Sequence, residues 1–210
     1  MGLLLAAFLG YLLGAIPFGL IIGRLTKGID LREHGSHRTG ATNALRTLGT
    51  RAAAAVFVLD VAKGVAAVLL ARLFLADDPL VEWAAAVAGF AAIVGHNWSL
   101  FIGFSGGRGV STTAGALGAM SIWTFIVLVP IVAGMIWRSR YVSLGSITGA
   151  LVAPIITAFL AVIGAATVPA VVYALASGFL VTVAHADNIG RLRAGTERKL
   201  GQKEAAESGG

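Results

Sequence analysis

Residues 108–138 read RGVSTTAGALGAMSIWTFIVLVPIVAGMIWR, a long apolar stretch with an arginine at each end and no charge between them. By the positive-inside rule both arginines lie on the cytoplasmic side of a membrane, so the chain between them crosses the bilayer an even number of times. At 1.5 Å per residue this stretch is about 43 Å of helix, against about 60 Å for two full crossings. We therefore expect a short half-helix over 110–120 and a longer helix over 122–137. A short helix is tolerated at membrane depth only where protein or a water-filled cavity satisfies its backbone.

Apolar stretches recur along most of the chain. Of its 210 residues, 57% are hydrophobic and 12% are charged, about half the charged fraction of an ordinary soluble domain. This composition indicates an all-α integral membrane protein with about seven transmembrane helices, the central ones short or broken. The other five spans are expected over residues 3–25, 52–75, 80–94, 144–164 and 168–184. Residues 1–203 form one domain in this interpretation, and 204–210 form a disordered tail.

The charges predict which side of the membrane each loop faces. The net charge is +6, and the basic residues concentrate in 24–51, around Arg108 and Arg138, and after the last apolar stretch, whereas the turn 76–83 is acidic. The basic loops are therefore cytoplasmic, the N-terminus is external and the C-terminus is cytoplasmic. The first apolar stretch lacks a basic start and a clear cleavage site, so it is expected to be retained as a helix. This topology accounts for the basic residues without a nucleic-acid partner.

The longest interior polar section lies between the first two apolar segments. It contains Gly-Ser-His-Arg-Thr-Gly-Ala-Thr-Asn at 35–43, followed by Arg46. Backbone N–H groups in such a bend can form an anion-binding nest, and a helix starting near Thr42 would add its positive end. A phosphate would suit this site. The alternative is a solvated turn whose glycines only permit tight bends.

Three further loops on the same predicted face carry hydrogen-bond donors and cations. The glycines on either side of Arg108 let the backbone approach a ligand closely, and the guanidinium fork matches phosphate oxygens. No loop supplies a dense cluster of carboxylates, so the common target is an anion. The candidate residues of these loops are His96, Asn97, Gly106, Gly107, Arg108, Gly109, Ser143, His185 and Asn188.

Two ionisable residues stand inside the second apolar segment. Asp60 and Lys63 are three residues apart, so on a helix they can neutralise each other. Charges inside a membrane are costly and are functional hypotheses by default. We favour a structural pair, with a proton relay as the alternative.

Taken together, the four polar loops resemble the motifs of the bacterial acyl-phosphate:glycerol-3-phosphate acyltransferases, the PlsY family. The likeness extends from Leu12 to about Thr196 and includes Asp60 and Lys63. The resemblance implies a seven-helix enzyme of the bacterial inner membrane, with its active site facing the cytoplasm. Such an enzyme moves a fatty acyl group from acyl phosphate to the sn-1 hydroxyl of glycerol 3-phosphate. The product is lysophosphatidic acid, made in the first step of phospholipid synthesis.

The resemblance also implies roles for individual residues. The expected catalytic residues are Ser36, Arg108, Ser143 and His185. The expected substrate-binding residues are Gly35, Gly40, Thr42, Asn43, Arg46, His96, Asn97, Gly106, Gly107, Gly109 and Asn188. Arg108 stands where the family pattern has lysine, which keeps the charge and adds a planar fork. The expected partners are the two substrates and the bilayer; no cofactor or metal is implied, and a monomer is compatible with the sequence.

Two other functions remain open. A small-anion or phosphate-ester transporter would also use a broken helix and basic loops, but it would need polar residues on both membrane faces and an internal repeat. The external turns here carry little beyond three acidic residues, which favours an enzyme. His34, His37 and Glu33 could hold a metal ion, but no further soft ligand is near them in the sequence.

Overall fold

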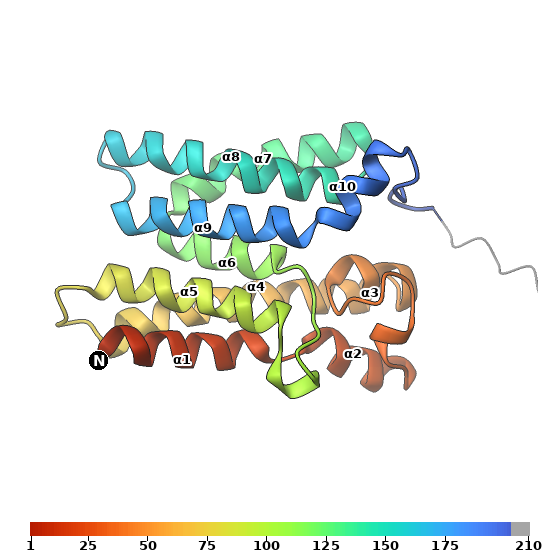
Figure 1. The fold of residues 1–210 in the computed structure, drawn as a ribbon, viewed down its shortest axis with the longest axis horizontal. Coiled ribbons are helices and arrows are strands. Elements are labelled where there is room, and N and C mark those ends of the chain that lie inside the picture. Colours follow the sequence, from red (N-terminus) through yellow and green to blue (C-terminus); the bar gives the residue numbers. More distant parts are fainter. Residues whose placement is uncertain (203–210) are drawn as a thin grey trace, which may run out of the picture.

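The computed structural model describes residues 1–202, and within them helices carry nearly all the regular structure (Figure 1). The predicted tail 204–210 lies outside the described residues. The helices are α1 (Gly2–Ala15), α2 (Phe18–Lys27), α3 (Ala41–Thr47), α4 (Thr50–Phe74), α5 (Val81–Asn97), α6 (Val110–Met120), α7 (Ile122–Ser139), α8 (Val142–Val162), α9 (Val168–Ala184) and α10 (Ala186–Arg193), with single 3₁₀ turns η1 (Leu31–Glu33) and η2 (Leu100–Ile102).

The first predicted span is not one continuous helix. It breaks between α1 and α2 at Ile16 and Pro17, where Ile16 has φ −59° and ψ 116°. Proline has no N–H to donate and disfavours helical geometry in the residue before it, so the helical backbone hydrogen bonds of α1 stop there. Together the two helices, at 26 residues, are still long and apolar enough to cross a membrane.

The other predicted segments are helices close to their expected bounds. By length and composition, four stretches of the described chain can cross a membrane: α1 with α2, α4, α7 and α8. A fifth is added if α9 and α10, bent by 58°, count as one span. The helices α5 and α6 have 17 and 11 residues and fall below the span length. α6 coincides with the half-helix expected over 110–120.

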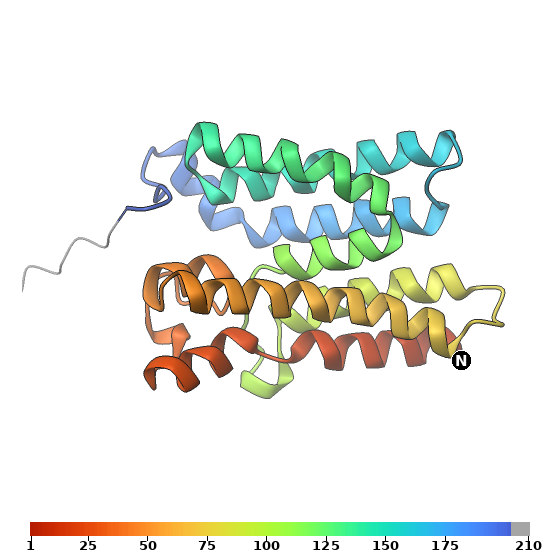
Figure 2. The ribbon, with the colours of Figure 1, turned by 180° about the vertical axis from the view of Figure 1, so that it is seen from behind.

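The helices lie lengthwise side by side. In Figure 1, α1, α4 and α5 form one group and α7, α8 and α9 another, with α6 between them. Figure 2 shows the same order from behind. Close approach of α1 to α5 depends on Gly10 and Gly14, because a Cβ on either would collide with the backbone of Ala88 or Ala92. Small residues allow this kind of close helix contact in lipid.

Protein groups satisfy the backbone where α6 ends and α7 begins. Arg72 donates to the Ala119 carbonyl at 2.7 Å, near the end of α6. Ser121 ends α6 and caps α7, and its hydroxyl pairs with that of Thr124 at 2.8 Å. At this turn side chains therefore satisfy the Ala119 carbonyl and the Thr124 N–H, which is the protein-based arrangement that a short helix in a membrane allows.

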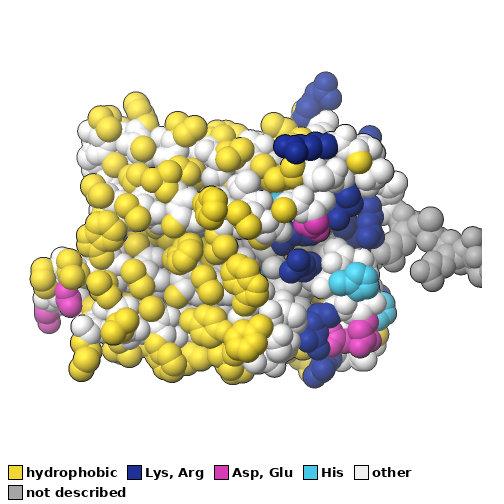
Figure 3. All heavy atoms as spheres, in the orientation of Figure 1, with side chains coloured by type: hydrophobic (Ala, Val, Ile, Leu, Met, Phe, Trp, Pro, Cys, Tyr) yellow, Lys and Arg dark blue, Asp and Glu magenta, His cyan; other side chains and the backbone are white. Residues whose placement is uncertain are grey.

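The two ends of the bundle differ in charge. Lysine and arginine side chains gather at the end formed by α2, α3 and α10, with some acidic ones among them, whereas the opposite end shows acidic side chains and no basic ones in this view (Figure 3). The α4–α5 turn lies at that acidic end together with the N-terminus (Figure 1), and Gly2 packs beside Leu75 and Asp78. All four polar loops identified in the sequence lie toward the basic end.

Candidate active site

The first polar loop is folded around the side chain of Asn43. Its Oδ1 accepts the backbone N–H of Ser36 at 2.9 Å, and its Nδ2 donates to three loop carbonyls. These belong to Leu31, His34 and Arg38, at 3.0, 3.0 and 2.8 Å. Gly35 has φ +62° and lies so close to the Asn43 amide that a Cβ would collide with it. Asn43 and Gly35 therefore shape the loop, and the Ser36 N–H is used inside it rather than held free in a nest.

The hydroxyl of Ser36 forms no hydrogen bond within residues 1–202, so it is available to a ligand. Gly40 is the N-cap of helix α3. The helix starts at Ala41, one residue before the start expected near Thr42. Arg46 lies in the last turn of that helix and is half-buried. The loop thus brings one free hydroxyl and one cation to the basic end.

The glycine loop, residues 103–109, lies on the last turn of α5. Gly107 donates its N–H to the His96 carbonyl at 3.1 Å. A Cβ at Gly106 would collide with that carbonyl, and one at Gly107 with the His96 ring. Gly109 has φ +73° and starts α6, a conformation that favours glycine. These glycines therefore allow close packing that brings Arg108 to the start of α6.

His96 and Asn97, both expected to bind substrate, end helix α5 beneath the glycine loop. Both are buried. His96 Nδ1 lies 3.4 Å from Asp60 Oδ1. Both polar atoms of the Asn97 side chain are buried with no hydrogen-bond partner among the described residues. Both side chains lie against the glycine loop: a Cβ at Gly107 would collide with the His96 ring, and one at Gly109 would come within 3.0 Å of Asn97 Oδ1.

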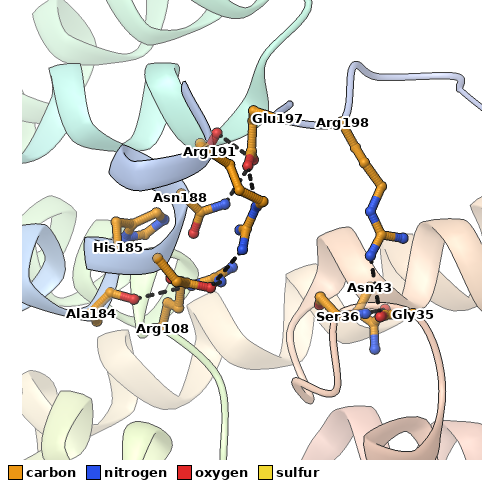
Figure 4. Close-up of polar contacts among 12 residues, drawn as sticks. Gly35, Ser36, Asn43, Arg108, Ala184, His185, Asn188, Arg191, Glu197 and Arg198 are labelled. Atoms are coloured by element: carbon orange, nitrogen blue, oxygen red, sulfur yellow. Dashed lines mark hydrogen bonds and ion pairs between the residues drawn. The ribbon is translucent and has the colours of Figure 1, made fainter. Parts of the chain in front are cut away.

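Arg108 is held by the end of α9 and the start of α10 (Figure 4). Its Nε donates to the Ala184 carbonyl at 3.1 Å, and its Nη2 lies 2.6 Å from Asp187 Oδ2. Asp187 also pairs with Arg191 at 3.2 Å. Burial lowers the pKa of Arg108, and the Asp187 carboxylate only partly opposes this. The guanidinium is thus fixed, charged and placed in a partly desolvated site.

Glu197 is a central site residue that the sequence analysis missed. Its carboxylate accepts from Ser143 Oγ and Asn188 Nδ2 through one oxygen and from Arg191 Nε through the other, each at 2.7 Å (Figure 4). It is the only acidic residue between Asp187 and Glu204, within a basic stretch, which is the one signal that could have drawn attention to it. Burial raises the pKa of Glu197, but these hydrogen bonds outweigh burial and hold it below its usual value.

His185 stands at the junction of α9 and α10 and is 3% exposed. Its Nδ1 lies 2.8 Å from the Val181 carbonyl. A carbonyl oxygen only accepts, so Nδ1 carries the proton, and in the neutral ring Nε2 is an acceptor. Asn188 has a similar arrangement, because Glu197 takes its Nδ2 and leaves Oδ1 buried without a partner in the described chain. The site therefore contains two fixed acceptors beside its cations.

Positive charge exceeds negative charge at this end. Burial lowers the pKa of Arg46, and the positive charges of Arg198, Arg108 and Arg191 lower it further. Arg198 also reaches the Gly35 carbonyl at 3.4 Å, linking the C-terminal segment to the first loop (Figure 4). An anion of two charges would relieve this repulsion. In the described chain no three His, Asp or Glu side chains are placed to hold a metal ion.

The sequence profile of the glycerol-3-phosphate acyltransferase family matches residues 4–195. The chain belongs to the glycerol-3-phosphate acyltransferase family. A glycerol-3-phosphate acyltransferase of Moorella thermoacetica is 46% identical to it, over 95% of this chain and 98% of the relative. One from Dehalococcoides mccartyi is 44% identical, over 96% and 97%.

Solved structures of the glycerol-3-phosphate acyltransferase family share the fold. The integral membrane acyltransferase PlsY in its glycerol 3-phosphate form has a TM-score of 0.85 and 37% identity, over 96% of each chain. Its lysophosphatidic acid form gives 0.83 and 36%, with the same coverage. This protein is therefore an acyltransferase and an integral membrane protein, and the transporter alternative is not supported.

Proposed function

We propose that this chain transfers a fatty acyl group from acyl phosphate to the sn-1 hydroxyl of glycerol 3-phosphate, in the first step of phospholipid synthesis. The bond from the acyl carbon to the phosphate oxygen breaks as the bond to the sn-1 oxygen forms. The phosphate leaves with the electron pair and takes up the hydroxyl proton. The products are lysophosphatidic acid and inorganic phosphate.

One observation carries this proposal: the site is rich in cations and donors, and its two carboxylates are already bound by arginine. Asp187 pairs with Arg108, and Glu197 with Arg191. The chain also has no cysteine to act as a nucleophile. An acyl phosphate is already activated, so an enzyme needs mainly to orient two anionic substrates and stabilise the developing oxyanion. A site of this composition suits such a donor.

The arrangement suggests a division of roles. Arg108 and Arg46 supply positive charge for the phosphates, and the free hydroxyl of Ser36 donates to the reacting group or to a phosphate. Thr42 adds a second hydroxyl one residue into α3. The acceptors Asn188 Oδ1 and His185 Nε2 suit the hydroxyl groups of glycerol, which must donate when they are buried.

Purified protein incubated with palmitoyl phosphate and radiolabelled glycerol 3-phosphate tests the proposal. We expect labelled lysophosphatidic acid and inorganic phosphate in equal amounts. Palmitoyl-coenzyme A at the same concentration, as a comparison donor, should give no product. Turnover with the thioester and none with the acyl phosphate would contradict the donor assignment.

We also propose the topology that places this site. In it residues 1–203 form a single acyltransferase domain of seven spans in the bacterial inner membrane, with the N-terminus outside and the site at the cytoplasmic face. A monomer suffices, since all the proposed site residues come from one chain. The support is the concentration of lysine and arginine side chains at one end of the bundle (Figure 3).

The cysteine-free sequence makes this topology directly testable. Asp77→Cys, in the α4–α5 turn, should react with a membrane-impermeant maleimide in intact spheroplasts. Arg193→Cys, at the end of α10, should react only after permeabilisation. Both positions are exposed, so access through the protein does not limit labelling. The reverse pattern would put the site on the outer face.

A further inference from the structure

A buried charge network lies beneath the glycine loop and has no part in the proposed chemistry. Asp60 and Lys63 of α4 are 1% and 4% exposed, and Lys63 Nζ lies 2.8 Å from Asp60 Oδ1. The tertiary structure adds a third member from α5, because His96 Nδ1 lies 3.4 Å from the same oxygen. The pair expected from the sequence is therefore part of a three-residue network joining two helices.

One end of the network contacts the interruption between α1 and α2. Lys63 donates to the Ile16 carbonyl at 3.1 Å, within the interruption between α1 and α2. Its ammonium also lies 5.7 Å from the centre of the Phe18 ring, within cation–π range. Lys63 thus ties α4 to the point where the first span bends.

The other end supports the glycine loop. The His96 ring lies directly under Gly107, where a Cβ would collide with Nε2, and the Gly107 N–H donates to the His96 carbonyl. Gly107 immediately precedes Arg108. A change in the tilt of the ring therefore shifts the segment that carries the guanidinium.

We propose that Asp60, Lys63 and His96 form a positioning network that sets the height and orientation of the glycine loop, and through it the position of Arg108. A buried ion pair is a poor way to add stability, since apolar side chains of similar volume often do as well or better. The fixed geometry of such a network can instead orient a neighbouring residue, here Arg108. Asp60 directs the ring, and Lys63 holds Asp60 against the first span.

A double-mutant cycle tests this inference, which rests on the proposed acyl transfer. Asp60→Asn keeps the shape of the side chain and removes its charge. In the otherwise unchanged protein it should lower kcat at least tenfold. In an Arg108→Ala background, assayed at high enzyme concentration, the same substitution should lower the residual kcat less than threefold, because the residue being positioned is gone. His96→Gln should show the same coupling, and it supplies the test if Asp60→Asn does not fold.

Glu82→Gln is the matched control, because it breaks an ion pair joining the same two helices at the acidic end. It should lower the melting temperature and leave kcat within twofold in both backgrounds. The inference is overturned if Asp60→Asn lowers kcat by equal factors in both backgrounds, or lowers only the melting temperature. If the unsubstituted protein makes no lysophosphatidic acid, the proposed function fails instead, so the two failures are distinguishable.

Discussion

At the acidic end of the molecule, Arg72 of α4 pairs with Glu82 of α5 at 2.8 Å and caps the carbonyl of Ala119. At the basic end, Arg108 pairs with Asp187, but Arg46 forms no ion pair with a described carboxylate, and the arginines repel one another. At the acidic end the protein itself pairs the arginine, whereas at the basic end the positive charge of the arginines exceeds the negative charge of the carboxylates around them. A cation whose charge and donors are fully used supports the fold, whereas a surplus of cations in a partly desolvated site indicates an anionic ligand.

The sharpest test of this difference removes site donors. Arg108→Ala and Ser36→Ala should each lower turnover about 10² to 10³-fold, the usual cost of removing a donor that stabilises developing charge. Ser36→Ala should leave the melting temperature unchanged, because no described group bonds to its hydroxyl. Steady-state kinetics with palmitoyl phosphate measure the effect. Near-normal turnover in both variants would mean that the chemistry occurs elsewhere.

Glu197→Gln should destabilise the basic end by about 2 kcal/mol, because one amide oxygen cannot replace the two carboxylate oxygens that accept from the buried Ser143 and Asn188 and from the partly exposed Arg191. The lowered pKa of Glu197 gives this effect a pH dependence. The carboxylate stabilises the fold above its ordinary value of 4.5, and its contribution is lost as the pH falls through the lower, folded-state pKa. The difference in melting temperature between the unsubstituted protein and Glu197→Gln should therefore be largest at pH 7 and shrink below about pH 4.5. A gap independent of pH would show that charge is not its cause.

Arg108→Lys tests whether the shape of the cation matters beyond its charge. Lysine cannot span the Ala184 carbonyl and Asp187 together as the guanidinium does. We expect kcat/KM to fall about tenfold, and to fall more for the substrate that contacts the guanidinium of Arg108 than for the other substrate. Titration of each substrate at saturating levels of the other separates the two. An unchanged kcat/KM would show that only the positive charge of Arg108 matters, and not its planar shape.

The smallest effect on activity is expected at the acidic end. Glu82→Gln should cost about 1 kcal/mol of stability, because both partners are partly exposed, and should leave turnover within twofold. A melting curve and one kinetic assay suffice. A large loss of turnover would show that the acidic end is coupled to the site and would remove the contrast between the two ends.

Residues of the site differ in how far the sequence could predict them. Glycines flank Arg108 in one polar loop and Gly35 precedes Ser36 in another, but the catalytic roles of both residues were implied only by the family resemblance. Asn43 was expected to bind substrate, and the structure adds that its amide folds the loop. That role depends on which carbonyls come within reach, and a loop sequence alone does not specify them.

The sequence by itself determined the apolar helices, because burial in lipid requires a continuous run of apolar residues that can be read locally. α9 occupies the expected residues 168–184, and α6 the expected 110–120. Only the tertiary structure decided which polar side chains meet. Glu197 bonds to Ser143 across 54 residues of chain, and His96 reaches Asp60 from a different helix. Contacts between distant segments depend on how helices pack, and they leave no periodic pattern in a single sequence.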